Sequence, residues 1–284
     1  MANQNRRPVA LVTGASRGVG KAIAVALAAH GYDLVITGRT MEEGSAVNPA
    51  NGQPLPGSLR TTADEIAARG TRCFPVQADI LDLDDVPKSF DRCLTVAGGQ
   101  LDLLVNNAIY VGPGNDSRLA DIDPTDIVRR VNGNLTAHLL MTQAFIRHWL
   151  SVGTPAATII NITSDAGRRT PPVPADQGGW STVYAATKAG FNRMADMLTL
   201  EYGDRGLHIL NVNPGLVATE RVIGSGIHLK WIADRGVAPA DIGDAVARIA
   251  HDDMIPSGTY LHAQDYLTTR ADREHFPHYD NEIT

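Results

Sequence analysis

TGASRGVG, residues 13–20, directly follows the apolar run PVALV at residues 8–12 and precedes an alanine-rich stretch, Lys21–Ala29, that ends at His30-Gly31. The apolar run predicts a short buried strand, and the alanine-rich stretch predicts a helix that is closed by a glycine. The chain therefore begins with a strand, a tight glycine turn and a helix.

The three glycines of this turn, Gly14, Gly18 and Gly20, favour a phosphate-binding turn. Glycine lets the backbone approach a pyrophosphate closely, and the N-terminus of the next helix presents unpaired N–H groups and a partial positive charge. The spacing differs from G-x-G-x-x-G, since three residues separate the first two glycines and one separates the last two. An ordinary glycine-rich connection between a strand and a helix is the alternative.

Short apolar runs alternate with helical stretches along the rest of the chain. This rhythm predicts an α/β fold, a Rossmann-like doubly wound parallel sheet of about seven strands with helices on both faces. The further strands are expected at Leu34–Thr37, Arg72–Val76, Leu101–Val105, Ala157–Ile162 and His208–Val212. The further helices are expected at Thr61–Arg69, Leu83–Val96, Pro124–Leu150, Thr182–Asp204 and Ala240–His251.

Residues 1–284 are expected to form a single domain, because no break in composition divides them. The stretch Thr40–Arg60 contains VNPANGQPLPG, whose proline, glycine and asparagine content favours neither helix nor strand. We therefore expect an irregular insertion near residues 40–60.

The composition limits the possible partners. The chain has a formal net charge of −6 and a pI near 5.8, without a basic stripe, so we expect no nucleic-acid partner. No apolar run is long enough to span a bilayer, and the N-terminus lacks a signal-peptide pattern. We expect a cytoplasmic protein without a membrane partner, in which Cys73 and Cys93 are buried free thiols.

Polar residues and glycines follow one expected strand after another. They are the glycine turn after the first strand, Arg39 after the second, Asp79 after the third, Asn106-Asn107 at the fourth, Ser164 after the fifth and Asn213-Pro214-Gly215 after the sixth. Ligands of open α/β sheets bind outside the carboxyl ends of the strands. We interpret this rim as a cleft for a dinucleotide and a substrate.

Tyr184 and Lys188 lie one helical turn apart in the run YAATK, on the helix expected from Thr182. On one face of a helix, the Lys188 ammonium can approach both the Tyr184 oxygen and a nucleotide ribose. A phenol with a pKa near 10 is a poor acid–base catalyst at neutral pH, and each unit of depression needs about 1.4 kcal/mol of phenolate stabilisation. A nearby ammonium supplies part of it. An exposed pair on a helix is the alternative.

The motifs TGASRGVG, NNA, ITS, YAATK and NPG occur in this order along the chain. With these motifs the chain resembles the short-chain dehydrogenase/reductase superfamily in its ordinary single-domain form. The resemblance extends from Pro8 to about His262. The resemblance implies a catalytic tetrad of Asn134, Ser164, Tyr184 and Lys188. Asn134 is preferred to Asn132 because the run NLTAHLLMTQA, which begins at Asn134, matches the family helix in register.

The resemblance also implies the roles of these residues. Tyr184 would give a proton to the carbonyl oxygen in reduction and take it back in oxidation, and Ser164 would orient that oxygen. Asn134 would hold a water in a proton relay to Lys188. A nicotinamide cofactor supplies the hydride.

The positions that match the cofactor-binding elements of the family lie along the whole rim. They are Gly14, Ser16, Arg17, Gly18, Val19, Gly20, Arg39, Asp79, Ile80, Asn107, Ala108, Tyr184, Lys188, Pro214, Gly215, Val217 and Thr219. By the resemblance, Asp79-Ile80 contacts the adenine and Thr219 reaches the nicotinamide carboxamide.

The residues after the second strand favour NADP(H) over NAD(H). Gly38 stands where an NAD enzyme has an acid that binds both ribose hydroxyls; Arg39 follows it, and Arg17 lies in the glycine turn. An acid there would repel a 2′-phosphate, whereas guanidinium groups bind phosphate through paired hydrogen bonds. The alternative is that Arg39 simply faces solvent.

Three departures from the family pattern concern the substrate side. Ile109 stands where glycine is usual and is followed by Tyr110. Residues 168–181, which include RRTPPVPADQGGW, are longer than usual and form either a wall over the substrate, with Trp180 as an apolar contact, or a surface insertion. Residues 257–284 lack the usual paired glycines, and we expect them to cover the cleft or a subunit contact.

The histidines give no sign of a metal site. His262, His275 and His278 lack a known carboxylate–histidine spacing, so we expect no metal and a solvated tail. His138 and His148 are expected at a surface or an interface rather than in catalysis.

The function that the sequence favours is an NADP(H)-dependent oxidoreductase that interconverts a secondary alcohol and a ketone. Its small-molecule substrate is expected to have an apolar or cyclic body. A redox-silent NADP(H)-binding sensor is one alternative, and a Rossmann-like methyltransferase is another. The resemblance also implies a homodimer or homotetramer.

Overall fold

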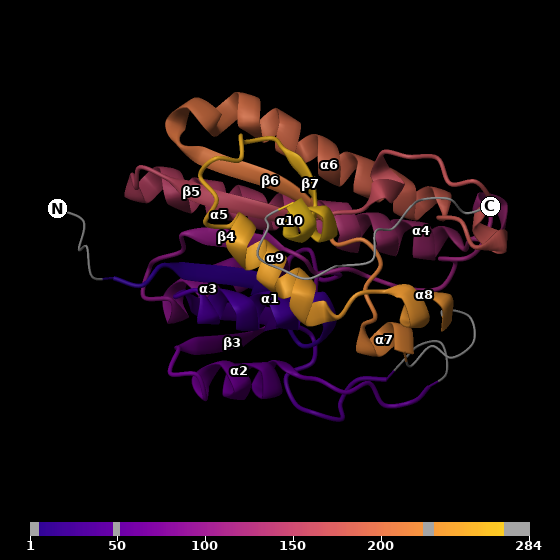
Figure 1. The fold of residues 1–284 in the computed structure, drawn as a ribbon, viewed down its shortest axis with the longest axis horizontal. Helices are drawn as coiled ribbons and strands as arrows, with labels where there is room; N and C mark the ends of the chain where they lie inside the picture. Colours follow the sequence, from indigo (N-terminus) through magenta and orange to yellow (C-terminus); the bar gives the residue numbers. More distant parts are fainter. Residues whose placement is uncertain (1–5, 48–51, 224–229, 270–284) are drawn as a thin grey trace.

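The structure is a computed structural model that describes residues 6–47, 52–223 and 230–269. Seven parallel strands form one sheet in the order β3-β2-β1-β4-β5-β6-β7 (Figure 1). They are β1 (Val9–Thr13), β2 (Asp33–Gly38), β3 (Cys73–Gln77), β4 (Leu103–Asn106), β5 (Ala157–Ile162), β6 (Leu207–Asn213) and β7 (Tyr260–His262). The predicted doubly wound parallel sheet is confirmed.

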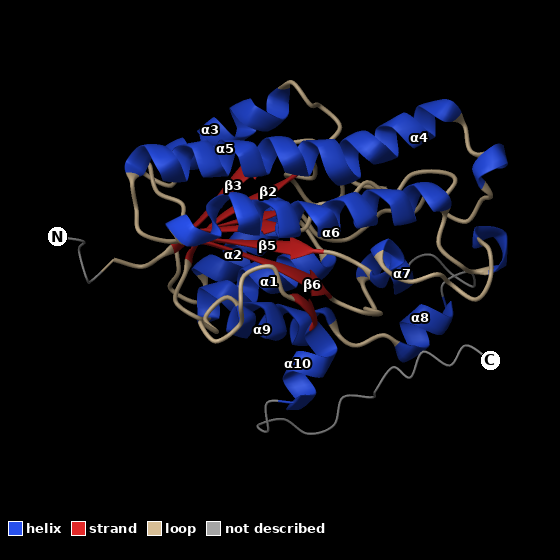
Figure 2. Cartoon of the chain, turned by 90° about the horizontal axis from the view of Figure 1, so that it is seen from above, coloured by secondary structure: helices blue, strands red, loops and turns tan. Residues whose placement is uncertain are grey.

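Helices cover both faces of the sheet, as Figure 2 shows from above. They are α1 (Gly18–Ala29), α2 (Leu59–Ala67), α3 (Asp85–Val96), α4 (Pro124–Val131), α5 (Ala137–Val152), α6 (Thr182–Tyr202), α7 (Glu220–Ile223), α8 (Lys230–Arg235), α9 (Pro239–Ile249) and α10 (Ala263–Thr269). Within the described residues, no helix combines the length and the apolar character that crossing a bilayer requires.

The two faces of the sheet belong to two separate clusters of buried side chains. Ala10 and Val12 of β1 pack with residues of α1, α2, α9 and α10, whereas Val9 and Leu11 pack with residues of α3, α5 and α6. Successive side chains of a strand point to opposite faces, so a strand that is apolar throughout requires helices on both sides. The apolar runs in the sequence reflect this arrangement.

The expected helix Pro124–Leu150 is not continuous. A π-helical turn, Asn132–Thr136, separates α4 from α5. Such a turn contains one extra residue per hydrogen-bonded ring and is often found at functional sites. Here it is the turn that carries Asn134.

The insertion near residues 40–60 is shorter than predicted. Helix α2 begins at Leu59, and the Ser58 hydroxyl accepts a hydrogen bond from the Thr61 backbone N–H at 3.0 Å. Val47 and Pro54 form an isolated antiparallel bridge. The serine cap satisfies an N–H group of the first helical turn, and Leu59 and Arg60 are good helix formers, so the helix begins two residues before the predicted Thr61.

The C-terminal part of the described chain packs on the core. Strand β7 pairs with β6, and Ala263 and Leu267 of α10 are buried in the cluster that contains α9. Because β7 is an edge strand of the sheet, the expectation that residues 257–284 cover the cleft or a subunit contact stays a prediction. Residues 270–284 lie outside the described part.

Replacement of Gly20 by Ala is expected to destabilise the fold by about 1–3 kcal/mol, the usual cost of overpacking. A Cβ atom there would lie 2.3 Å from both the Gly14 carbonyl oxygen and the Asn107 amide nitrogen. Gly203→Ala is the control, because its Cβ would lie 3.6 Å from the Thr199 methyl group, an ordinary contact, and its φ is −62°. Urea unfolding measures the free energy of unfolding of both variants. If Gly20→Ala were as stable as Gly203→Ala, the steric argument would be contradicted.

Candidate active site and nucleotide cleft

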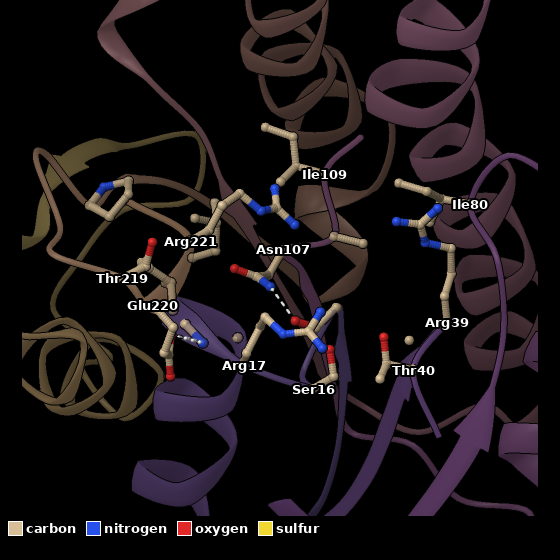
Figure 3. Close-up of a pocket in the computed structure, with 18 of the residues that line it drawn as sticks. Ser16, Arg17, Arg39, Thr40, Ile80, Asn107, Ile109, Thr219, Glu220 and Arg221 are labelled. Atoms are coloured by element: carbon tan, nitrogen blue, oxygen red, sulfur yellow. Dashed lines mark hydrogen bonds between the residues drawn. The ribbon is translucent and has the colours of Figure 1, made fainter. Parts of the chain in front are cut away.

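A cavity of about 270 Å³ lies at the carboxyl ends of the strands, where the order of the sheet passes from β1 to β4. It is lined by Gly14, Ser16, Arg17, Gly18, Val19, Gly20, Gly38, Arg39, Thr40, Ala78, Ile80, Asn107, Ala108, Ile109, Ile162, Thr163, Tyr184, Lys188, Pro214, Thr219, Glu220 and Arg221. Figure 3 shows part of this lining. Most of the predicted cofactor-binding residues therefore share one cavity.

The glycine turn is held to β4 by side chains. The Thr13 hydroxyl accepts hydrogen bonds from the N–H groups of Asn107 (2.9 Å) and Ala108 (3.0 Å). The Asn107 side-chain amide donates to the Thr13 carbonyl oxygen at 2.8 Å. Asn107 thus lines the cavity and also braces the turn, which fixes the backbone that a phosphate would approach.

The N-terminus of α1 presents a donor set that fits a pyrophosphate. Arg17 stands at the N-cap without a side-chain capping bond, and the first turn has no acidic residue. Gly14 and Gly18 have positive φ values of 71° and 58°, a region that disfavours other residues. The helix dipole and the backbone N–H groups of this turn favour an anion here, and the Gly18 N–H already donates to the Glu220 carboxylate at 2.9 Å.

Two arginines, Arg17 at the start of α1 and Arg39 after β2, line the cavity. The Arg17 guanidinium donates to the carbonyl oxygens of Pro56 (2.9 Å) and Gly57 (2.6 Å). Burial lowers the pKa of Arg17, with Glu220 and Glu43 opposing this shift and Arg39 adding to it. Arg39 lines the cavity beside Ile80 and Thr40 (Figure 3) and is exposed, so a role in phosphate binding stays a prediction.

Some of the predicted cofactor residues support the cavity from outside its lining. Asp79 accepts a hydrogen bond from the Leu81 N–H at 2.9 Å. Gly215, with φ 69°, and buried Val217 shape the loop after β6. Gln264 of α10 donates to the carbonyl oxygen of Pro214 at 2.9 Å. These residues lie behind or beside residues that line the cavity, such as Ile80 and Pro214.

Tyr184 and Lys188 reach the cavity from the first turns of α6. Lys188 is 5% exposed and its ammonium donates to the Ile162 carbonyl oxygen at 2.9 Å; burial lowers its pKa to about 8. Within the described residues no hydrogen bond joins it to Tyr184. Burial raises the pKa of Tyr184, while a hydrogen bond from Ser164 and the charge of Arg130 act in the opposite direction.

Asn134 holds the loop after β4. Its side-chain oxygen accepts from the Tyr110 N–H at 2.7 Å, and its amide donates to the Tyr110 carbonyl oxygen at 3.1 Å. Asn134 is buried, whereas Asn132 is half-buried. Both polar atoms of Asn134 thus fix the wall that follows Ile109.

His138 lies in the core, so the expected surface or interface position is wrong. Its Nε2 lies 2.8 Å from the Ala108 carbonyl oxygen, and burial lowers its pKa to about 4. The neutral imidazole packs on Phe191 with ring centroids 4.7 Å apart. His138 supports Ala108 from beneath the cavity floor, whereas His148 is half-buried.

Segment 168–181 approaches the loop after β4. Arg118 and Asp176 form an ion pair at 2.8 Å between the two, and Ala175 is buried. Trp180 and Ile109 are each 36% exposed. The ion pair thus joins segment 168–181 to the loop after β4. This contact is compatible with both alternatives for the segment, a wall over the substrate and a surface insertion.

His262 is not part of a solvated tail. It lies in β7, and its Nε2 is 3.5 Å from Asp165, which also accepts a hydrogen bond from the Tyr260 hydroxyl at 2.8 Å. The described residues contain no group of His, Cys, Asp and Glu that is arranged for a metal. His275 and His278 lie outside the described residues.

Three charged residues near the cavity were not predicted. Glu220 and Arg221 line it from α7, and Arg130 is 1% exposed at the end of α4. The Arg130 guanidinium donates to Asn115 Oδ1 (2.8 Å), to the Pro113 carbonyl oxygen (2.7 Å) and to that of Gly112 (3.1 Å). Only the position of Glu220-Arg221 directly after Thr219 offered a signal in the sequence.

Comparison with known proteins agrees with this geometry. A family model described as short chain dehydrogenase matches residues 8–226. A 3-oxoacyl-[acyl-carrier-protein] reductase from Synechocystis sp. is 32% identical over 265 residues, which cover 91% of this chain and 94% of that protein.

Two solved structures share the fold. A 3-oxoacyl-[acyl-carrier protein] reductase from Brucella melitensis in complex with NAD matches with a TM-score of 0.75 and 25% identity, over 92% of this chain and 96% of that one. A protein from Agrobacterium tumefaciens with bound NADP, proposed to be a 2-deoxy-D-gluconate 3-dehydrogenase, matches with a TM-score of 0.70 and 26% identity, over 90% and 94%.

The burial of Lys188 makes a prediction about stability and pH. Its pKa is about 8 in the folded chain and near 10.5 ordinarily, so between these values the unfolded chain binds more protons. The free energy of unfolding should therefore gain up to about 3 kcal/mol from Lys188 as pH rises from 8 towards 10.5. Urea unfolding of Lys188→Met from pH 7 to 9.5 should show that this gain is lost.

Lys88→Met, an exchange at an exposed lysine of α3, is the control and should keep the wild-type dependence on pH. Identical slopes for wild type and Lys188→Met would show that Lys188 is not buried as a strained cation.

Proposed function

Because the chain belongs to the short-chain dehydrogenase/reductase family, whose members are nicotinamide-nucleotide oxidoreductases, we propose that it is an NADP(H)-preferring enzyme that interconverts a secondary alcohol and a ketone. The observation that carries this proposal is the position of Tyr184 and Lys188 in the same cavity as the glycine turn. Ser164 lies close enough to hydrogen-bond Tyr184. An acid–base group thus lies beside a nucleotide site.

Each residue of the tetrad has a distinct task in this proposal. The nucleotide, when bound, exchanges the hydride. Tyr184 gives its phenolic proton to the carbonyl oxygen in reduction and accepts it in oxidation, and Ser164 donates a hydrogen bond that orients this oxygen. Lys188 supplies positive charge near the ribose, and Asn134 fixes the neighbouring wall and a water of the proton relay.

The preference for NADP(H) rests on this chain's own residues, since the similar structures include one complex with NAD and one with NADP. Arg39 follows β2 directly and lines the cavity together with Arg17. Gly38 carries no carboxylate that would repel a 2′-phosphate. Guanidinium groups at this end favour the phosphorylated ribose.

The substrate is proposed to have an apolar or cyclic body. Ile109 and Trp180 leave part of their apolar surface exposed, and Tyr110 follows Ile109 on the loop that Asn134 holds. The Synechocystis relative is named for a 3-oxoacyl substrate, so a 3-oxoacyl thioester belongs in any substrate panel.

A homodimer or homotetramer is proposed from exposed apolar residues on the long helices. Leu139 of α5 is 46% exposed, and Met197 and Leu200 of α6 are 42% and 78% exposed. Helices that carry such residues on their outer faces favour association with a second copy. Of the alternatives, membership of the family argues against the methyltransferase, and the redox-silent sensor is left to experiment.

Tyr184→Phe is expected to lower turnover by about 10²–10⁴-fold, because it removes the proton donor. The assay is NADPH oxidation at 340 nm with ketones, cyclic carbonyls and a 3-oxoacyl thioester. Tyr202→Phe, an exchange at the end of the same helix, is the control. NADPH binding without turnover of any carbonyl by the wild type would favour the sensor.

Arg39→Ala is expected to raise the Michaelis constant for NADPH about 10- to 100-fold and to change that for NADH little, because a hydrogen bond to a charged group contributes about 1.5–3 kcal/mol. The measurement is steady-state kinetics with each nucleotide at a fixed substrate concentration. The control is Arg69→Ala, at an exposed arginine outside the cavity. Equal effects on both nucleotides would remove Arg39 from 2′-phosphate recognition.

A further inference from the structure

The short helix α7 is fixed to the glycine turn by Glu220. Its carboxylate Oε2 accepts a hydrogen bond from the Gly18 backbone N–H at 2.9 Å, although the two residues are 202 positions apart. The preceding Thr219 also lies close, since a Cβ atom on Gly18 would be 3.4 Å from the Thr219 methyl group. The start of α7 is therefore docked on the first turn of α1.

This docking carries the neighbouring Arg221 into the cavity. Figure 3 shows Arg221 near Ile109 on one side of the pocket and Arg39 near Ile80 on the other. Arg17 lies between them in the same view. Burial lowers the pKa of Arg221, and the charges of Arg17 and Arg39 lower it further, so the three guanidinium groups act on one another.

The resulting charge of the cavity is opposite to that of the chain. Among the described residues that line the cavity, Arg17, Arg39, Lys188 and Arg221 are basic and Glu220 alone is acidic, whereas the chain as a whole has a net charge of −6. Like charges that converge in a partly buried cavity repel one another. A bound polyanion relieves this repulsion, and a dinucleotide phosphate has a pyrophosphate at its centre and a 2′-phosphate at one end.

We propose that Arg221 is a cofactor-binding residue that clamps the pyrophosphate from α7, and that Glu220 is a positioning residue that holds α7 against the glycine turn. The inference rests on the proposed nucleotide site. Arg221 lies across the pocket from Arg39, so the two arginines divide the phosphates: Arg39 binds the 2′-phosphate, and Arg221 binds the pyrophosphate that NADP(H) and NAD(H) share. Because Arg221 follows Thr219 by two residues, the same clamp orders the segment that is expected to reach the nicotinamide.

The test is a comparison of dissociation constants, which needs no turnover. Fluorescence titration with NADPH and NADH, and calorimetry with ADP-ribose and adenosine 2′-monophosphate, are applied to Arg221→Gln and Arg39→Gln. Arg221→Gln should weaken NADPH, NADH and ADP-ribose by a similar factor, about 10- to 100-fold, and leave adenosine 2′-monophosphate unchanged. Arg39→Gln should weaken NADPH and adenosine 2′-monophosphate only.

Further variants separate charge, position and folding. Arg221→Lys keeps the charge and should retain part of the affinity, and Glu220→Asp, which keeps the charge but shortens the reach to the Gly18 N–H, should weaken NADPH and NADH by the same small factor, about two- to tenfold. Arg235→Gln removes an exposed arginine of α8 outside the cavity and should bind like the wild type. Thermal unfolding of each variant establishes that the chain is folded.

The possible failures are distinguishable. If Arg221→Gln binds all four probes as the wild type does, or loses affinity only for those with a 2′-phosphate, the pyrophosphate clamp is overturned while the nucleotide site stands. If the wild type binds neither NADPH nor NADH, the proposed function itself fails.

Discussion

The first turn of α1 lies so close to the preceding turn and to the residues after β4 that no side chain fits between them. A Cβ atom on Gly20 would approach the Gly14 carbonyl oxygen and the Asn107 amide to 2.3 Å, and one on Gly14 would lie 2.7 Å from the Ala108 Cα. This contact fixes the direction of α1 relative to β1 and β4. It also aims the N–H groups of the helix N-terminus at the cavity, so the nucleotide site depends on the absence of side chains at these two glycines.

The same place joins distant parts of the chain. Thr13 and Asn107 connect the turn to β4, His138 supports Ala108 from α5, and Glu220 connects the turn to α7. Each partner comes from a different strand end or the helix behind it. In an open parallel sheet the carboxyl ends of all strands meet at one edge, which is why residues so far apart in sequence share these contacts.

The parts that sequence predicts well are those that local patterns determine. The strands follow from runs of apolar residues that are buried on both faces, and Tyr184 and Lys188 lie where YAATK and helical spacing place them. The π-helical turn at Asn132–Thr136 was missed because one extra residue in a turn leaves the local helix propensity unchanged. The positions of His138 in the core and of Arg221 at the cavity were missed because they depend on contacts with residues far away in sequence.

The electrostatics of the site oppose the stability of the fold. Burial lowers the pKa of Lys188 to about 8 and raises that of Tyr184, so each group resists the charged form that acid–base chemistry uses. The Ile162 carbonyl oxygen accepts a hydrogen bond from the Lys188 ammonium, and Ser164 and the buried Arg130 favour the phenolate of Tyr184. A fold selected for stability alone would place apolar side chains at these positions. This chain instead gives two strained groups specific polar partners, and that arrangement supports the proposed role of this corner of the cavity in acid–base chemistry.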